Sequence, residues 1–199
     1  PMTNIAIAFK DYNIFAGTWA SPWANPLGKY FIQAFSSAEF VRALWNTIYL
    51  NVLDLIFSFP APIIVAIMLN ELAFKKFKRV TQTILYMPHF LSWIVIAGLA
   101  MQILAPETGM VNVLLRHMGF EPIPFLNDSG HWVGTYVALG VWQSAGWNTI
   151  IYLAAITGID TELYEAAEVD GASRFRKIWH ITLPGIRPTI VTLLILQMG

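Results

Sequence analysis

A few polar side chains stand inside long apolar stretches of the sequence, where burying them in lipid is costly. They are Asn51 and Asp54 in one stretch, and Gln143 and Asn148 in another, with Trp142 and Trp147 beside the second pair. Amides and carboxylates hydrogen-bond to hydroxyls, and indole rings stack on sugar rings. These six residues are therefore candidates for a sugar pathway. Hydrogen bonding between helices requires the same residue types and is the competing interpretation.

Other chemistry finds no support in the residues. The sequence has no G-x-x-x-x-G-K-[S/T] phosphate loop and no H-E-x-x-H zinc motif. The four histidines are far apart, and cysteine is absent. Ser, His and Asp occur without a spacing that singles out a triad. We predict no catalytic residue, no metal site and no cofactor held by this chain.

The composition indicates a membrane protein. Of the 199 residues, 56% are hydrophobic and only 12% are charged, the net charge is zero, and the mean hydropathy is +0.56. Soluble domains carry about twice that charged fraction. Disorder is excluded because it requires low hydrophobicity and high charge. Nucleic-acid binding is disfavoured because no basic excess is present.

Four apolar stretches can be compared with the roughly 20 residues that a helix needs to cross a bilayer. Thr47–Leu69 contains a single charge, that of Asp54, whereas Ile84–Leu104 and Trp132–Ile156 contain none. Each of the three is long enough to span. Pro188–Met198 is about half that length, and we interpret it as the start of a fourth span. The sequence therefore predicts an all-α polytopic transmembrane bundle.

The basic residues orient these spans. Eight of the 12 Lys and Arg lie in the stretches 70–81 and 157–187. The positive-inside rule places both stretches in the cytoplasm and 105–131 outside. We expect 1–43 to be an external or interfacial segment and 44–199 to form the membrane domain. The chain opens without a visible signal peptide and closes inside an apolar run, which suggests a piece of a longer product.

The stretch 157–187 has the clearest local signals. Asp160 can cap a helix through Ala167, Gly171 stands where that helix would end, and Ser173 can cap a second helix. The second helix has an apolar stripe, and Leu183-Pro184 is expected to end it. The stripe is formed by Phe175, Ile178, Trp179, Thr182 and Leu183. Docking to a partner and a plain solvated connector explain this pattern equally well.

Three short elements of this stretch resemble a known motif. They are Glu165-Ala166-Ala167, Asp170-Gly171-Ala172 and Ile181-Thr182-Leu183-Pro184. Together they are similar to the EAA loop of binding-protein-dependent ABC importer permeases of the maltose-permease type. Further segments resemble the polysaccharide and oligosaccharide (LplB-like) subgroup. These are Ile7-Ala8-Phe9-Lys10-Asp11-Tyr12, Asn70-Glu71, Phe77-Lys78-Arg79, Tyr86-Met87-Pro88-His89-Phe90, Gly146-Trp147 and Ile151-Tyr152-Leu153-Ala154-Ala155-Ile156.

The resemblance implies a type I ABC importer permease fold from which the first and last helices are missing. It implies that the loop at about 157–187 is cytoplasmic and that its coupling helix, at about 161–171, sits in a groove of an ATPase subunit. The implied docking residues are Glu165, Ala166, Ala167, Asp170, Gly171 and Arg174. The implied partners are two ATPase subunits carrying ATP and Mg²⁺, a second permease subunit, an extracellular solute-binding protein, membrane lipid and a sugar cargo. Nucleic acid is not among them.

An alternative function is ion-coupled secondary transport or a channel. Such proteins need an ionisable relay inside the membrane. Asp54 is the sole acidic residue within the predicted spans, which makes such a relay sparse. A membrane-embedded enzyme would need catalytic residues converging at one depth, and none is apparent. We expect a multi-pass protein of the cell membrane that is a transport subunit and not an enzyme.

Overall fold

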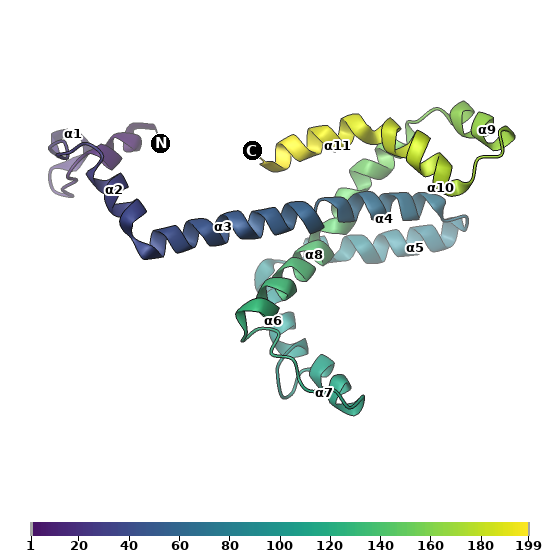
Figure 1. The fold of residues 1–199 in the computed structure, drawn as a ribbon, viewed down its shortest axis with the longest axis horizontal. Helices are drawn as coiled ribbons and strands as arrows, with labels where there is room; N and C mark the ends of the chain where they lie inside the picture. Colours follow the sequence, from purple (N-terminus) through teal and green to yellow (C-terminus); the bar gives the residue numbers. More distant parts are fainter. Residues whose placement is uncertain (1, 199) are drawn as a thin grey trace. The chain divides into compact units, whose positions relative to one another are not determined.

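The computed structural model describes residues 2–198, and the regular elements of this part of the chain are helices (Figure 1). The predicted all-α class is confirmed. An isolated β-bridge joins Lys10 and Trp23. The chain divides into two compact units, Pro1–Asn51 and Val52–Gly199, which meet within helix α3 (Ala38–Phe57). The predicted functional division after residue 43 stays a prediction.

The first unit is tied together by polar contacts between short elements. These elements are η1 (Met2–Phe9), α1 (Gly17–Ala20) and α2 (Lys29–Ser36). Lys10 donates to the carbonyls of Thr18 (2.9 Å) and Trp19 (3.0 Å), so a buried ammonium is satisfied by backbone oxygens. Asp11 accepts from Lys29 (2.8 Å), and this contact lowers the pKa of the Asp11 carboxyl.

The first predicted span is confirmed as part of a longer helical stretch. Ala38–Glu71 comprises 34 residues and is long and apolar enough to cross a membrane. A turn at Ser58 and Phe59 separates α3 from α4 (Pro60–Glu71). Pro60 opens α4, where its missing N–H removes no helical hydrogen bond.

The second predicted span, Ile84–Leu104, is interrupted by a sharp bend. α5 (Lys75–Tyr86), η2 (Met87–Phe90) and α6 (Trp93–Ile103) replace it, with a bend of 104° at the break. Pro88 lies in η2 and cannot donate to a continuing helix. Ser92 then starts α6 by accepting from the backbone N–H of Val95 (3.4 Å). The prediction relied on the uniform apolarity of this stretch, which does not show that Ser92 starts a new helix within it.

The third predicted span is one helix, α8 (Ser129–Thr157), which follows the short α7 (Met110–His117). Asp128 caps α8 by accepting from the backbone N–H groups of Gly130 and His131, both at 3.1 Å. With 29 residues α8 is long enough to cross a bilayer. Because it contains glycines, hydroxyls and amides, its mean hydropathy is too low for it to count as a candidate span by composition.

The last part of the chain differs from the prediction at Pro184. The helix does not end there, because Arg174–Met198 is one helical stretch of 25 residues that is itself a candidate span. It comprises α10 (Arg174–Lys177), the π-helical turn η3 (Ile178–Thr182) and α11 (Leu183–Met198). In η3 the N–H of Leu183 donates to the carbonyl of Ile178, which widens the turn before the proline. Pro188 also lies inside α11.

The core of the second unit lies where α4, α8 and α11 meet. Its fully buried members are Ala66, Tyr152, Ile156 and Ile186. The hydroxyl of Thr149 in α8, itself fully buried, lies 3.2 Å from the carbonyl oxygen of Pro62 in α4. Figure 1 shows α8 crossing α4. This junction fixes the faces of the three helices that carry the polar residues described below.

Candidate functional site

The predicted coupling helix exists as α9 (Thr161–Val169). Asp160 caps it by accepting from the backbone N–H of Glu162 at 3.0 Å, as predicted. Gly171 has φ = +73°, a left-handed conformation that strains any residue with a Cβ. Ser173 accepts from the N–H of Arg176 at 3.3 Å and starts α10. The three local predictions are confirmed, and together they form a helix, a glycine turn and a second helix.

The predicted docking residues lie mainly on the open side of this element. Glu165, Ala166, Asp170, Gly171 and Arg174 are exposed, and Ala167 is half-buried. Two apolar side chains of α9 stand among them, Leu163 at 53% exposure and Val169 at 89%. The alanines leave room for another backbone to approach this face closely, and Leu163 and Val169 add exposed apolar surface to it.

Few contacts attach α9 to the rest of the unit. The hydroxyl of Tyr164 lies 2.9 Å from that of Thr182 in η3. Lys177 of α10 lies 3.5 Å from the carboxylate of Glu168. At the base of the loop, a Cβ on Gly185 would lie 2.6 Å from Cδ1 of Ile159, so the glycine admits that side chain. The orientation of α9 therefore rests on a partly buried hydroxyl pair, the Lys177–Glu168 contact and a glycine contact.

A hollow of about 550 Å³ lies behind α9, on the side facing α10 and η3. Its lining includes Ala167 and Asp170 from the predicted docking set, together with Arg176, Lys177 and His180. On another face of the second helix, the rings of Phe175 and Trp179 stack 6.2 Å apart and are exposed. Two of the five residues of the predicted apolar stripe, Phe175 and Trp179, are thus exposed, while its Thr182 is buried.

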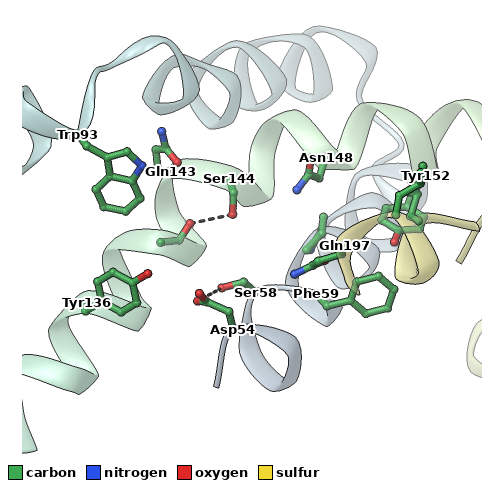
Figure 2. A pocket seen from close by; sticks show the side chains of 14 residues that line it. Asp54, Ser58, Phe59, Trp93, Tyr136, Gln143, Ser144, Asn148, Tyr152 and Gln197 are labelled. Carbon is green, nitrogen blue, oxygen red and sulfur yellow. Dashed lines mark hydrogen bonds between the residues drawn. The ribbon is translucent and has the colours of Figure 1, made fainter. Parts of the chain in front are cut away.

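The second candidate site is a cavity of about 390 Å³ beside the α4–α8–α11 core. Figure 2 shows the lining side chains, which come from α3, the Ser58–Phe59 turn, α4, α6, α8 and α11. The lining residues are Asp54, Ser58, Phe59, Pro62, Trp93, Tyr136, Gly140, Gln143, Ser144, Asn148, Tyr152, Leu193, Leu196 and Gln197. Amides, hydroxyls and aromatic rings dominate, a combination suited to a ligand with many hydroxyls.

The carboxylate of Asp54 points from α3 toward α8 (Figure 2). Its Oδ1 accepts a hydrogen bond from Ser58 at 3.2 Å. Opposite it, Gly140 leaves space, because a Cβ built there would lie 3.8 Å from Oδ1. Ser144, one turn further along α8, donates to the carbonyl of Gly140 at 2.8 Å. The carboxylate therefore faces an opening maintained by a glycine.

The structure brings together three of the six predicted pathway residues, namely Asp54, Gln143 and Asn148. Asn51 is exposed and donates to the Thr47 carbonyl of its own helix at 2.7 Å. Trp142 is 47% exposed and does not line the cavity, although it neighbours Gln143 in sequence. Trp147 stacks on His89 of η2, with ring centroids 4.7 Å apart.

Several lining residues escaped the sequence analysis. Three of them carry an aromatic ring or a hydroxyl inside an apolar run, and no sequence signal distinguishes them from packing residues. They are Ser58, Trp93 and Tyr136. Gln197 lies near the end of the fourth apolar stretch and could have been found as an amide inside an apolar run. Gly140 could be identified only from the opposing helix. Within residues 2–198, no group of three or more potential ligand side chains is placed to hold a metal ion.

Comparison with known proteins places the chain in a family. Residues 31–199 match the family described as binding-protein-dependent transport system inner membrane component. The chain is 45% identical to Protein LplB and to the polygalacturonan/rhamnogalacturonan transport system permease protein YteP, both of Bacillus subtilis, over all 199 residues. It spans 62% and 61% of their lengths.

A solved structure agrees with these relatives. The crystal structure of a bacterial ABC transporter involved in the import of the acidic polysaccharide alginate matches with a TM-score of 0.90 and 41% identity. The match covers 100% of this chain and 65% of that one. The predicted permease fold and the multi-pass membrane location are thereby confirmed. The chain belongs to the family of binding-protein-dependent transport system inner membrane components.

Proposed function

We propose that this chain is part of the permease subunit of an ATP-driven importer for a sugar or oligosaccharide. The observation that carries the proposal is α9, an exposed helix with the EAA motif that ends in a left-handed glycine. The related permease YteP is named for polygalacturonan and rhamnogalacturonan transport, and the similar solved structure belongs to an alginate importer. Both names support a carbohydrate cargo.

In this proposal α9 docks onto a cytoplasmic ATPase subunit, which holds ATP and Mg²⁺. Glu165, Ala166, Ala167, Asp170, Gly171 and Arg174 form the docking set. Closure of two ATPase subunits moves α9, and α9 passes the movement to α11 through Tyr164, Thr182 and Gly185. The permease needs two arrangements with different contacts to the ATPase, because a partner shifts an equilibrium only by binding its two states differently.

The remaining partners are a second permease subunit and an extracellular solute-binding protein that delivers the cargo. The cavity at Asp54, Gln143 and Asn148 provides this chain's contribution to the pathway. Many large apolar side chains of α3 and α11 are exposed, which fits contact with lipid and with a second subunit.

The docking helix can be tested in the full-length protein in its native host. A tagged permease is solubilised gently, and co-purifying proteins are identified by mass spectrometry. We expect an ATPase subunit to co-purify with the unaltered permease and to be lost from the Glu165→Lys variant. Glu162→Lys is the matched control, because Glu162 is an exposed carboxylate one turn earlier on α9. It should retain the ATPase.

The alternative, an ion-coupled transporter or channel, predicts a different pattern. A well-folded permease that brings down no ATPase would contradict the importer proposal. Uptake driven by an ion gradient and abolished by Asp54→Asn would then favour the alternative, since Asp54 is the acidic residue that faces the cavity.

A further inference from the structure

The charges around the cavity are unbalanced. Among the 14 lining residues in the described part of the chain, Asp54 is the one with a formal charge, and the others are amides, hydroxyls, aromatic rings, aliphatic side chains and a glycine. None of these 14 residues is a Lys or Arg that could neutralise a second anion. A negatively charged ligand would therefore meet a like charge inside a partly dehydrated space, which is strongly unfavourable.

The same carboxylate suits a neutral ligand. A carboxylate has about four acceptor positions, and the hydrogen bond from Ser58 at 3.2 Å uses one of them. The opening at Gly140 gives a ligand access to the remaining positions. Sugar hydroxyls are donors, and hydrogen bonds to a charged acceptor are stronger than those between neutral groups. Trp93 and Tyr136, whose rings stack with centroids 6.4 Å apart, lie on the same side of the cavity (Figure 2).

We propose that Asp54, facing the opening at Gly140, excludes acidic sugars from the cavity and selects neutral oligosaccharides as cargo. This inference rests on the proposed function and narrows its substrate class. It separates this chain from the alginate importer that it resembles, because the cargo of that transporter is an acidic polysaccharide.

The charge preference can be measured without any sugar. The 199 residues contain no cysteine, so Ser144→Cys introduces a single thiol of similar size into the cavity lining. The assembled full-length transporter is prepared with any other cysteine replaced. Its thiol is treated with methanethiosulfonates that end in trimethylammonium or sulfonate. The ratio of the cationic to the anionic reaction rate reports the local charge.

Replacing Asp54 should change that ratio. We expect Asp54→Asn to lower the cationic-to-anionic ratio by about tenfold, the effect of removing roughly 1.4 kcal/mol of electrostatic bias. Asp54→Glu keeps the charge and should keep the ratio. Gly140→Ala adds a methyl group at ordinary contact distance from Asp54 and should slow both reagents while leaving the ratio unchanged. A ratio that Asp54→Asn does not alter would overturn the charge filter.

The substrate class is tested by protection of the same thiol against an uncharged methanethiosulfonate. The probes are an oligogalacturonate of four units and the same chain after its carboxyl groups are reduced to give galactose. We expect the reduced chain alone to protect the Asp54 protein, and both chains to protect Asp54→Asn. Equal protection by the acidic chain would overturn this inference and leave the proposed function standing. A third outcome is that neither oligosaccharide protects the thiol, although Asp54→Asn shifts the cationic-to-anionic ratio. In that case the cavity is not a sugar pathway, and both this inference and the pathway part of the proposed function fail.

Discussion

The proposed coupling element, α9 with its turn at Gly171, and the cavity belong to the same unit of the chain, but they are held in different ways. α9 exposes most of its side chains, and the hydroxyl pair of Tyr164 and Thr182 attaches it to η3. The cavity lies beside a junction of α4, α8 and α11 where Tyr152, Thr149 and Ile186 are fully buried. A docking surface must remain free for a partner, whereas a pathway must keep its shape. Because of this difference, we expect substitutions in α9 to affect ATPase binding without unfolding the protein, and substitutions in the helix packing beside the cavity to affect stability.

The largest expected effect is at the contact between α8 and α5. A Cβ on Gly146 would overlap the backbone carbonyl of Leu85, which cannot move as a side chain can. We expect Gly146→Leu to destabilise the protein by about 3 kcal/mol or more and to reduce folded protein in detergent. Gly134→Leu is the control on the same helix, because nothing lies within 4 Å of a Cβ there. The measurement is thermal unfolding with size-exclusion chromatography. Equal tolerance of the two would show that α8 and α5 do not pack so closely.

The next effect should be confined to the coupling element. Gly171 has φ = +73°, and a β-branched residue there is strained by roughly 1–2 kcal/mol. We expect Gly171→Val to weaken ATPase binding about tenfold in a quantitative pull-down and to leave the thermal midpoint nearly unchanged. Gly171→Asn is the control, since asparagine tolerates this conformation. If Gly171→Val instead unfolded the whole protein, the two regions would not be separable.

A smaller effect is expected at the attachment of α9. Tyr164→Phe removes the hydroxyl that lies 2.9 Å from Thr182 and leaves the ring in place. The loss of one hydrogen bond costs about 1 kcal/mol. We predict a severalfold decrease in uptake per ATP hydrolysed in proteoliposomes, with sugar protection of the cavity thiol unchanged. Unchanged coupling in this variant would show that α9 is oriented by other contacts.

The smallest effect concerns a cap remote from the coupling element. The backbone N–H of His131, followed by its ring nitrogen, lowers the pKa of the Asp128 carboxyl. A carboxyl whose pKa is lower in the folded state than in the unfolded state stabilises the fold at pH values above its unfolded-state pKa of ~3.9. This contribution disappears as the pH falls through the folded-state pKa.

Hydrogen exchange can check the sign of this effect. We expect amide protection at Gly130 and His131 to be greater in the native protein than in Asp128→Asn at pH 7. The difference should shrink as the pH approaches 3. A difference that persists at low pH would mean that the side-chain geometry, not its charge, caps α8. ATPase binding should be the same in both proteins.

The features that the sequence could predict are those set by neighbouring residues. The caps at Asp160 and Ser173 and the turn at Gly171 depend on side chains within three residues of the helix end. The break between Phe90 and Trp93 was not predicted, and the end of the helix at Pro184 was predicted wrongly, because apolarity and proline content do not show whether Ser92 will cap or a π turn will form.

The membership of the cavity was predictable only in part. Polarity inside an apolar run identified Asp54, Gln143 and Asn148, which line it. The same reasoning included Asn51, whose amide bonds to its own helix, and Trp147, which packs on His89. Those outcomes depend on which residue of another helix lies opposite, as does the space left by Gly140. A single sequence shows the chemistry of a side chain but not its partner across the fold.

The most direct test of the account is to ask whether α9 is the surface that the ATPase covers. Ala166→Cys places one thiol on the exposed side of α9, and Lys76→Cys places one in the other basic stretch predicted to be cytoplasmic. Both are introduced into the full-length transporter and labelled with a maleimide before and after the ATPase subunits are removed. The account predicts that Ala166→Cys is protected only when the ATPase is bound, while Lys76→Cys labels equally in both states. Labelling of Ala166→Cys that the ATPase does not change would contradict the account.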